Sequence, residues 1–116
     1  MRIFKNKLFN KWAEKEGLSD GALRNAVDEM ERSLIDADLG GHVMKKRVAV
    51  GGRGKRGGVR TRLAYKSGDK AFFVYGFAKN VRANVSTDEL KALKHLAKEL
   101  MGYSDKALTK PSSMAH

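Results

Sequence analysis

A run of basic residues without acidic neighbours is the most chemically suggestive feature of this sequence. No aspartate or glutamate lies between Asp38 and Asp69. The same window contains these basic residues: Lys45, Lys46, Arg47, Arg53, Lys55, Arg56, Arg60, Arg62 and Lys66. Over the whole chain, 24 Lys and Arg stand against 13 Asp and Glu, a formal net charge of +11. Charge focused in this way predicts a surface that binds a polyanion, either a nucleic acid or an acidic protein.

Arginines and lysines can support the cleavage of RNA without a metal ion. The 2′-hydroxyl of RNA attacks the adjacent phosphate when the strand is bent in line. An enzyme must then position the backbone, neutralise the developing negative charge and move two protons. Arginine suits the first two tasks, because its planar guanidinium stays charged and binds phosphate oxygens in pairs. A lysine whose pKa is lowered by neighbouring cations can act as the base or the acid.

Other kinds of catalytic site find little support. His42, His95 and His116 have no metal-ligand spacing, and no carboxylate cluster lies near the basic strands. Cysteine is absent, which excludes disulfides and thiolate nucleophiles. We therefore expect no metal and no cofactor. The first residues lack the apolar core of a secretory signal, and no run of apolar residues is long enough to span a membrane. We therefore expect a cytoplasmic location.

The glycine-rich segment Gly51–Gly58 is not a nucleotide-binding loop. A P-loop requires a glycine, four residues and then Gly-Lys-Ser/Thr at the start of a helix. Here Gly54-Lys55-Arg56 is followed by a predicted strand, and Ala49 occupies the upstream glycine position. The glycines and cations instead predict a mobile arm that wraps an RNA backbone.

Hydrophobic periodicity predicts one α+β domain over residues 1–101 and a loose tail over 102–116. The expected order is β-α-α-β-β-β-α, an antiparallel sheet with helices packed against it. In chain order, the predicted elements are an edge strand at 2–5, helices at Leu8–Glu16 and from Ser19 to about Ile35, strands at Val43–Val50, Val59–Lys66 and Lys70–Phe77, and a helix at Thr87–Met101.

Three details of this prediction concern the helices. Gly17 is expected to end the first helix, and Ser19 to cap the second. Trp12 lies at helical spacing from other apolar residues, so we expect it in the core rather than as a platform for a base. The apolar stripe of the second helix is predicted to be Leu23, Ala26, Val27, Met30 and Leu34.

Period-2 alternation predicts that the charge gathers on one face of the sheet. Arg60, Arg62 and Lys66 share a face of their strand, and Lys45 and Arg47 share a face of the preceding strand. If the two strands pair, these cationic faces can coincide. The opposite faces are predicted to carry Val59, Leu63 and Tyr65 in one strand and Met44, Lys46 and Val48 in the other.

Two motifs resemble those of a known family. These are Gly-Arg-Gly-Lys-x-Gly-Gly-x-Arg at residues 52–60 and Tyr-Gly-Phe-Ala-Lys-Asn-x-Arg at residues 75–82. Together they resemble the HigB-like branch of the RelE/ParE toxins of bacterial type II toxin–antitoxin pairs, and the resemblance covers about residues 3–101. It implies the microbial-RNase fold, entry into the ribosomal A site and metal-independent cleavage of messenger RNA, which inhibits translation. It also implies a cognate antitoxin that covers the basic face.

The resemblance also implies roles for individual residues. By position, Arg60 matches the arginine that contacts the scissile phosphate. Lys45 and Arg47 match basic positions of the second strand, and Lys79 and Arg82 match the basic cluster after the fourth strand.

Two positions depart from the RelE pattern. Asn80 stands where RelE has an arginine, and Ser86 stands where it has a tyrosine that stacks on RNA. The proton-transfer role therefore stays open among Lys55, Lys79 and Tyr75. The predicted catalytic residues are Arg60, Lys55, Lys79 and Arg82, and the predicted RNA-binding residues are Lys45, Arg47, Arg53, Arg56, Arg62, Lys66 and Asn80.

Two other functions fit the same residues. A ParE-like member would use this fold to poison DNA gyrase without nuclease chemistry. A non-catalytic module would use the same cations only to hold RNA or the ribosome. The focused basic face and Arg60 favour the nuclease over the ParE-like function. They do not distinguish the nuclease from the non-catalytic module, because binding and cleavage require the same charges.

Overall fold

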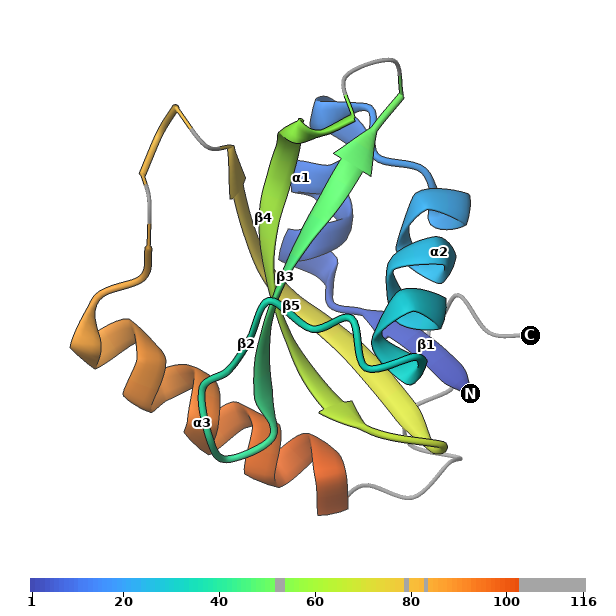
Figure 1. The fold of residues 1–116 in the computed structure, drawn as a ribbon. Helices are drawn as coiled ribbons and strands as arrows, with labels where there is room; N and C mark the ends of the chain where they lie inside the picture. The colour runs from blue at the N-terminus through green and yellow to red at the C-terminus, as the bar shows by residue number, and fades with distance from the viewer. Residues whose placement is uncertain (52–53, 79, 83, 103–116) are drawn as a thin grey trace.

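A five-stranded sheet lies at the centre of the part of the chain that this computed structural model describes, residues 1–51, 54–78, 80–82 and 84–102 (Figure 1). For residues 54–57 only the backbone is described. The elements are β1 (Arg2–Lys5), α1 (Lys7–Glu16), α2 (Asp20–Glu31), β2 (Ala37–Asp38), β3 (Val43–Val50), β4 (Gly54–Lys66), β5 (Lys70–Ala78) and α3 (Thr87–Gly102). The predicted α+β class is confirmed, with one short extra strand.

The strand order in the sheet is β1-β5-β4-β3-β2. Neighbouring strands from β2 to β5 pair antiparallel, as predicted, but β1 pairs parallel with β5, Arg2 lying beside Lys70. The expectation of a purely antiparallel sheet was therefore wrong at this edge. The partner of β1 comes from the far end of the chain, and a local pattern does not reveal which way such a partner runs.

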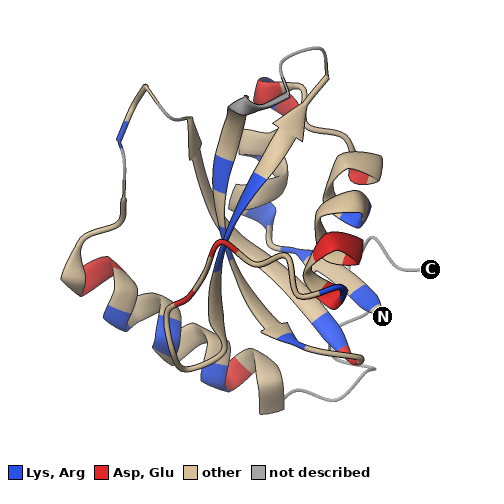
Figure 2. Cartoon of the chain, in the orientation of Figure 1, with Lys and Arg blue, Asp and Glu red and all other residues tan. Residues whose placement is uncertain are grey.

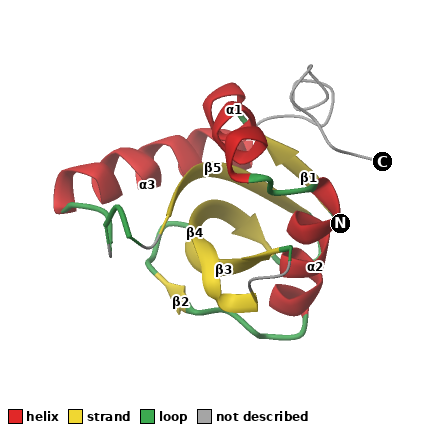
Figure 3. Cartoon of the chain, turned by 90° about the horizontal axis from the view of Figure 1, so that it is seen from above, coloured by secondary structure: helices red, strands yellow, loops and turns green. Residues whose placement is uncertain are grey.

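Helices cover both faces of the sheet (Figure 3). The first core lies under α1 and α2 and includes Phe9, Val27, Leu63 and Phe73. The second core lies under α3, where Phe4, Val43, Ala64, Val74, Ala97 and Leu100 are buried. Because β5 is covered on both sides, its near-continuous apolar run is explained. Helices α1 and α2 thus lie on one face of the sheet and α3 lies on the other.

The helix starts follow their capping residues. The Asn6 side chain accepts from the backbone N–H of Phe9, and the Ser19 hydroxyl accepts from Ala22 N. At α3, Glu89 N donates to Ser86 Oγ and Ser86 N donates to the Glu89 carboxylate, which forms a capping box.

Among the described residues, no helix combines the length and the apolar character needed to cross a membrane.

The second helix ends earlier than predicted. It stops at Glu31 rather than near Ile35, because Ser33 takes a left-handed conformation with φ of 69°. Ser33 N donates to Met30 O and the next amide donates to Glu29 O, the Schellman pattern that closes a helix. Leu34 consequently leaves the predicted apolar stripe and is 54% exposed. Glycine usually signals this ending, and here serine takes its place.

The glycine-rich segment was also predicted wrongly in part. The mobile arm was expected to run to Gly58, but β4 already begins at Gly54, which pairs with Val50. Backbone hydrogen bonds to β3 extend the strand through glycines that have low intrinsic strand propensity. Residues 52–53 lie outside the described residues. The segment before β3, for which no strand was predicted, contains the two-residue strand β2 beside Met44 and Lys45.

Trp12 packs in the first core, as predicted, and requires a glycine opposite it. Its ring lies beside Phe9 and over β5 at Gly76, where an added Cβ would come within 2.2 Å of the ring. A side chain cannot occupy that space unless the ring moves. Gly76 is therefore a packing requirement of the α1–β5 contact.

We expect Gly76→Ala to lower the free energy of unfolding by about 1–3 kcal/mol, because the new methyl group overlaps the indole. Equilibrium urea unfolding measures this change. Gly21→Ala is the matched control, since Gly21 lies in α2 with only the Ser19 hydroxyl near its added Cβ, at 3.7 Å. A Gly76→Ala protein as stable as the wild type would contradict the packing argument.

Candidate functional site

The pairing of β3 with β4 brings the predicted cations together. Arg47 lies opposite Arg60, and Lys45 lies opposite Arg62, so these four side chains share one face in two adjacent rows. Directly opposed side chains in an antiparallel pair have Cβ atoms about 5 Å apart. Figure 2 shows the resulting blue bands side by side on the two strands. The predicted coincidence of the cationic faces is confirmed.

Lys46 lies on the face of β3 opposite the one that carries Lys45 and Arg47. It is buried beneath α2, where its ammonium donates to Glu29 Oε1 and to Leu34 O, both at 2.7 Å. Thr61, its partner in β4, is buried as well and donates to Lys46 O. Neighbours in sequence therefore have opposite roles, one inside a core and the others on the cationic face.

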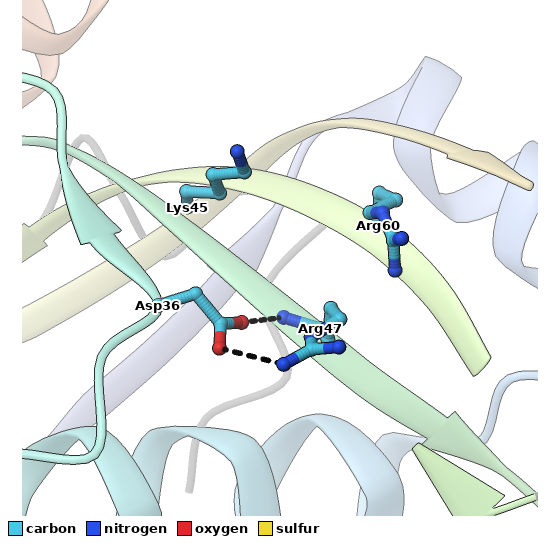
Figure 4. Close-up of a pocket in the computed structure, with 4 residues that line it drawn as sticks. All are labelled: Asp36, Lys45, Arg47 and Arg60. Carbon is cyan, nitrogen blue, oxygen red and sulfur yellow. Dashed lines mark hydrogen bonds and ion pairs between the residues drawn. The ribbon is translucent and has the colours of Figure 1, made fainter. Parts of the chain in front are cut away.

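A pocket of about 290 Å³ opens on this face and is lined by Asp36, Lys45, Arg47 and Arg60 (Figure 4). Asp36 accepts from the backbone N–H of Arg47 and lies 3.7 Å from its guanidinium. Nothing in the sequence indicated that a single carboxylate would line this pocket. Asp36 lies just outside the acid-free window, and the pairing of β2 with β3 brings it back beside Arg47.

Arg60 contributes a donor that lacks a partner. Its Nη1 atom is buried and, among the described residues, has no hydrogen-bond acceptor. The Nε atom of Arg62 is in the same condition. A buried unsatisfied donor is costly, and more so when it is charged. Because Arg60 lines the pocket, its unsatisfied donor indicates a place where an anion would be stabilised.

Arg62 itself is fully buried. It donates to Thr61 O and to Asn84 Oδ1, and its guanidinium lies 5.1 Å from the centre of the Phe77 ring. Burial lowers its pKa, and the charges of Arg60 and Arg82 add to this effect. The predicted direct contact of Arg62 with RNA does not agree with its burial, because the ring and the Asn84 loop cover it. It acts here as a charge beneath the surface.

Arg82 forms a network at the start of α3. Its guanidinium pairs with both carboxylate oxygens of Glu89 and donates to Tyr75 Oη at 3.2 Å. It also lies 5.6 Å from the Phe77 ring centre. The Arg82 hydrogen bonds lower the pKa of Glu89 from 4.5 to about 2, and Ser86 N–H adds to this. The network fixes Tyr75, which stands opposite Arg62 in the sheet.

Of the remaining predicted residues, the structure describes the side chains of Lys66 and Asn80, and neither lines this pocket. Lys66 lies six residues along β4 from Arg60, about 20 Å at strand spacing, and pairs with Asp69. Asn80 is exposed. Arg53 and Lys79 lie outside the described residues, and the side chains of Lys55 and Arg56 are not described.

Sequence reasoning missed three residues that organise the site. Asp36 and Asn84 each act through a contact with a strand that is distant in sequence. Residue spacing alone does not predict either contact. Glu89 carried a signal, because Ser86-x-x-Glu89 is a capping-box pattern, but its pairing with Arg82 depends on how the preceding loop folds.

The arrangement can bind a phosphate group. Arg47 and Arg60 supply exposed and half-buried guanidiniums from adjacent strands, Lys45 adds an ammonium, and Arg62 adds charge from below. Arginine matches phosphate oxygens in a bidentate manner. Within the described residues, no group of three metal-ligating side chains lies together.

Comparison with known proteins identifies one family. The family model described as the RelE toxin of the RelE/RelB toxin–antitoxin system matches residues 1–114 of the 116 in the chain. No curated protein matches the chain.

The ion pair between Glu89 and Arg82 predicts a pH effect. The pKa of Glu89 is lowered on folding, so its contribution to stability is complete above about pH 4.5 and is lost as the pH falls towards 2. Between these values, we expect the free energy of unfolding to fall more steeply in the wild type than in Glu89→Gln. Urea titrations at several pH values measure both. Glu99→Gln, an exposed change on the same helix, should behave as the wild type, and equal slopes for Glu89→Gln and wild type would refute the assignment.

Proposed function

Because the chain belongs to the RelE family of toxins from toxin–antitoxin systems, we propose that it is an endoribonuclease that cleaves messenger RNA on the ribosome and thereby inhibits translation. Like other toxins of such systems, it has a cognate antitoxin as a partner. We place its action in the cytoplasm, where messenger RNA is translated. The finer assignment to the HigB-like branch is supported by the motifs at residues 52–60 and 75–82.

One observation carries the proposal. Arg60, which lines the pocket with Arg47 and Lys45, has a buried Nη1 donor without an acceptor among the described residues. A phosphate oxygen that reaches Arg60 would satisfy this donor and offset the repulsion among the cations, to which the covered Arg62 adds its charge. A cation cluster that serves only solubility would have its donors in water instead.

The proposed reaction is attack of the RNA 2′-oxygen on the neighbouring phosphorus. A bond forms between O2′ and phosphorus and the bond to O5′ breaks, which leaves a 2′,3′-cyclic phosphate and a 5′-hydroxyl end. Arg60 and Arg47 would hold the phosphate from two strands and stabilise the additional charge of the transition state. Arg82, held by Glu89, would position Tyr75 near the same row.

Two protons must move in this reaction. One leaves the 2′-hydroxyl and one reaches the departing O5′. Tyr75, Lys55 and Lys79 are the proposed carriers. Tyr75 is the one whose surroundings are described, with its hydroxyl accepting a hydrogen bond from Arg82.

Arg60→Ala tests the proposal directly. We expect it to abolish growth arrest in bacteria and to reduce cleavage at least about 10²-fold, because a preorganised donor to the transition state is lost. The measurement is the mapping of messenger RNA 5′ ends on translating ribosomes after induction. The fold should persist, because the Arg60 Nη1 atom makes no hydrogen bond within the described structure.

Lys15→Ala, an exposed change on α1 across the sheet, is the matched control and should remain toxic. The nuclease proposal would be excluded if the wild type produced no new 5′ ends. Gyrase-dependent DNA breaks in place of RNA ends would favour the ParE-like function. Ribosome binding without cleavage would favour the non-catalytic module.

The salt dependence of RNA binding gives a second test. Each phosphate contact to single-stranded RNA contributes about 0.7 to the slope of log affinity against log salt. We expect Arg47→Ala to reduce that slope by about 0.7 and to weaken binding of all sequences alike. An unchanged slope would remove Arg47 from the phosphate site.

A further inference from the structure

A second basic pocket lies between α3 and the turn that precedes β3, at the end of β3 away from the β3–β4 turn. It has a volume of about 500 Å³ and is lined by Gly41, His42, Lys91, Lys94, His95, Lys98 and Met101. None of the described residues that line it is acidic. The blue bands of α3 in Figure 2 belong to its lysines. We call it the α3 pocket.

The four basic side chains of α3 follow helical spacing. Lys91, Lys94, His95 and Lys98 lie at positions i, i+3, i+4 and i+7, which places them along one side of the helix. The other side carries the apolar residues of the second core. Within the described residues no ion pair joins any of these three lysines to a carboxylate. No carboxylate in the described part of the chain therefore offsets these charges, which can act on a ligand.

The turn opposite α3 has an unusual backbone. Gly40, Gly41 and His42 all have left-handed φ values, of 88°, 57° and 67°. Lys94 crosses this turn closely, since a Cβ added at Gly41 would lie 3.2 Å from Lys94 Cγ. The glycines let the lysine stem pack against the backbone at Gly41, and its ammonium lies over Gly40, where an added Cβ would be 3.4 Å from Nζ.

His42 is held in this conformation although it is not glycine. A left-handed histidine is uncommon, and such conformations cluster at functional sites. Its Nδ1 lies 3.3 Å from Tyr65 O, so Nδ1 carries the proton in that hydrogen bond, which leaves Nε2 out of it. Tyr65 is itself fixed through its hydroxyl to Glu31. The ring therefore lines the α3 pocket from a defined position.

We call the pocket lined by Asp36, Lys45, Arg47 and Arg60 the sheet pocket. It lies on the same side of the molecule as the α3 pocket. Helix α3 packs on the face of the sheet that carries the cations, against β4 and β3. Lys45, which lines the first pocket, is the third residue of β3, and His42 immediately precedes that strand. An RNA strand that leaves the first pocket and follows β3 towards the turn reaches the α3 pocket.

We propose that the α3 pocket binds backbone phosphates of the same RNA strand that occupies the sheet pocket, beyond the nucleotides held at Arg60. This inference rests on the proposed function, because it assumes RNA in the first pocket. Lysines suit the task, since flexible ammonium groups follow a backbone without reading its sequence. The α3 pocket thus adds affinity and direction, and the sheet pocket holds the reacting phosphate.

The test compares RNA lengths with the full chain. The probes are a trinucleotide, which fills only one pocket, and a decanucleotide, which reaches both, each 2′-O-methylated so that cleavage cannot occur. For the decanucleotide we expect Lys91→Gln/Lys98→Gln to weaken binding about tenfold near 0.1 M salt and to reduce the salt slope by about 1.4. Binding of the trinucleotide should not change. Both lysines are exposed, so the fold is spared.

Lys11→Gln/Lys15→Gln is the matched control, because it removes two exposed charges from α1 across the sheet. It should leave both affinities close to those of the wild type. The inference is overturned if the α3 variant binds the decanucleotide like this control, if both lengths weaken equally, or if the wild type does not bind the decanucleotide. It is also overturned if the α3 variant weakens only the binding of ribosomes.

Failure of the proposed function would look different. In that case the wild type, induced in bacteria, would produce no 5′ ends that depend on Arg60. The length-dependent loss on Lys91→Gln/Lys98→Gln could still be present, because the modified probes report binding alone.

Discussion

The antiparallel register of β3 against β4 is the constraint on which the rest of the structure depends. It places Lys46 beside Thr61 under α2 and places Arg47 beside Arg60 on the other face. Since side chains alternate strictly along a strand, a slip of one residue would exchange the faces. The guanidiniums would then enter the first core and the valines of that core would face solvent. The apolar packing under α2 and the cationic pocket are thus fixed together.

Crowded cations are tolerated in this sheet because the protein neutralises them unequally. Arg47 and Arg82 each pair with a carboxylate, and these pairs lie at the edges of the cluster. Arg60 and Arg62, between them, have no hydrogen-bonded carboxylate among the described residues, and Arg62 relies on neutral acceptors and the Phe77 ring. The positive potential is consequently strongest in the interior of the cluster, where the stabilisation available to a bound anion is greatest.

Much of the fold follows from short-range rules in the sequence. Caps and apolar periodicity correctly predicted α1, α3 and the start of α2, and alternation correctly predicted which side of β3 and β4 carries the charge. These predictions succeed because each depends on residues within one or two turns. A helix cap or a strand face is decided locally, and tertiary packing reinforces that decision here.

The errors concern contacts between distant segments. Serine at position 33 gives no warning of a left-handed helix end, and Asp36 enters the site only because β2 pairs with β3. The burial of Arg62 depends on Asn84, which lies 22 residues away in sequence. The extension of β4 to Gly54 comes from pairing with Val50, which outweighs the low strand propensity of glycine. None of these partners can be chosen from one segment alone.

The parallel pairing of β1 with β5 has a consequence for the order of assembly. Strand β1 cannot pair until β5, which begins at Lys70, has been made. The second core is completed only by α3, which begins at Thr87. Parallel, long-range pairing forms slowly, because the loop between the partners must first be closed. During synthesis, the cationic strands therefore emerge before β5 and α3, which complete the sheet and its second helical layer. A finished site exists only once nearly the whole chain has left the ribosome that made it.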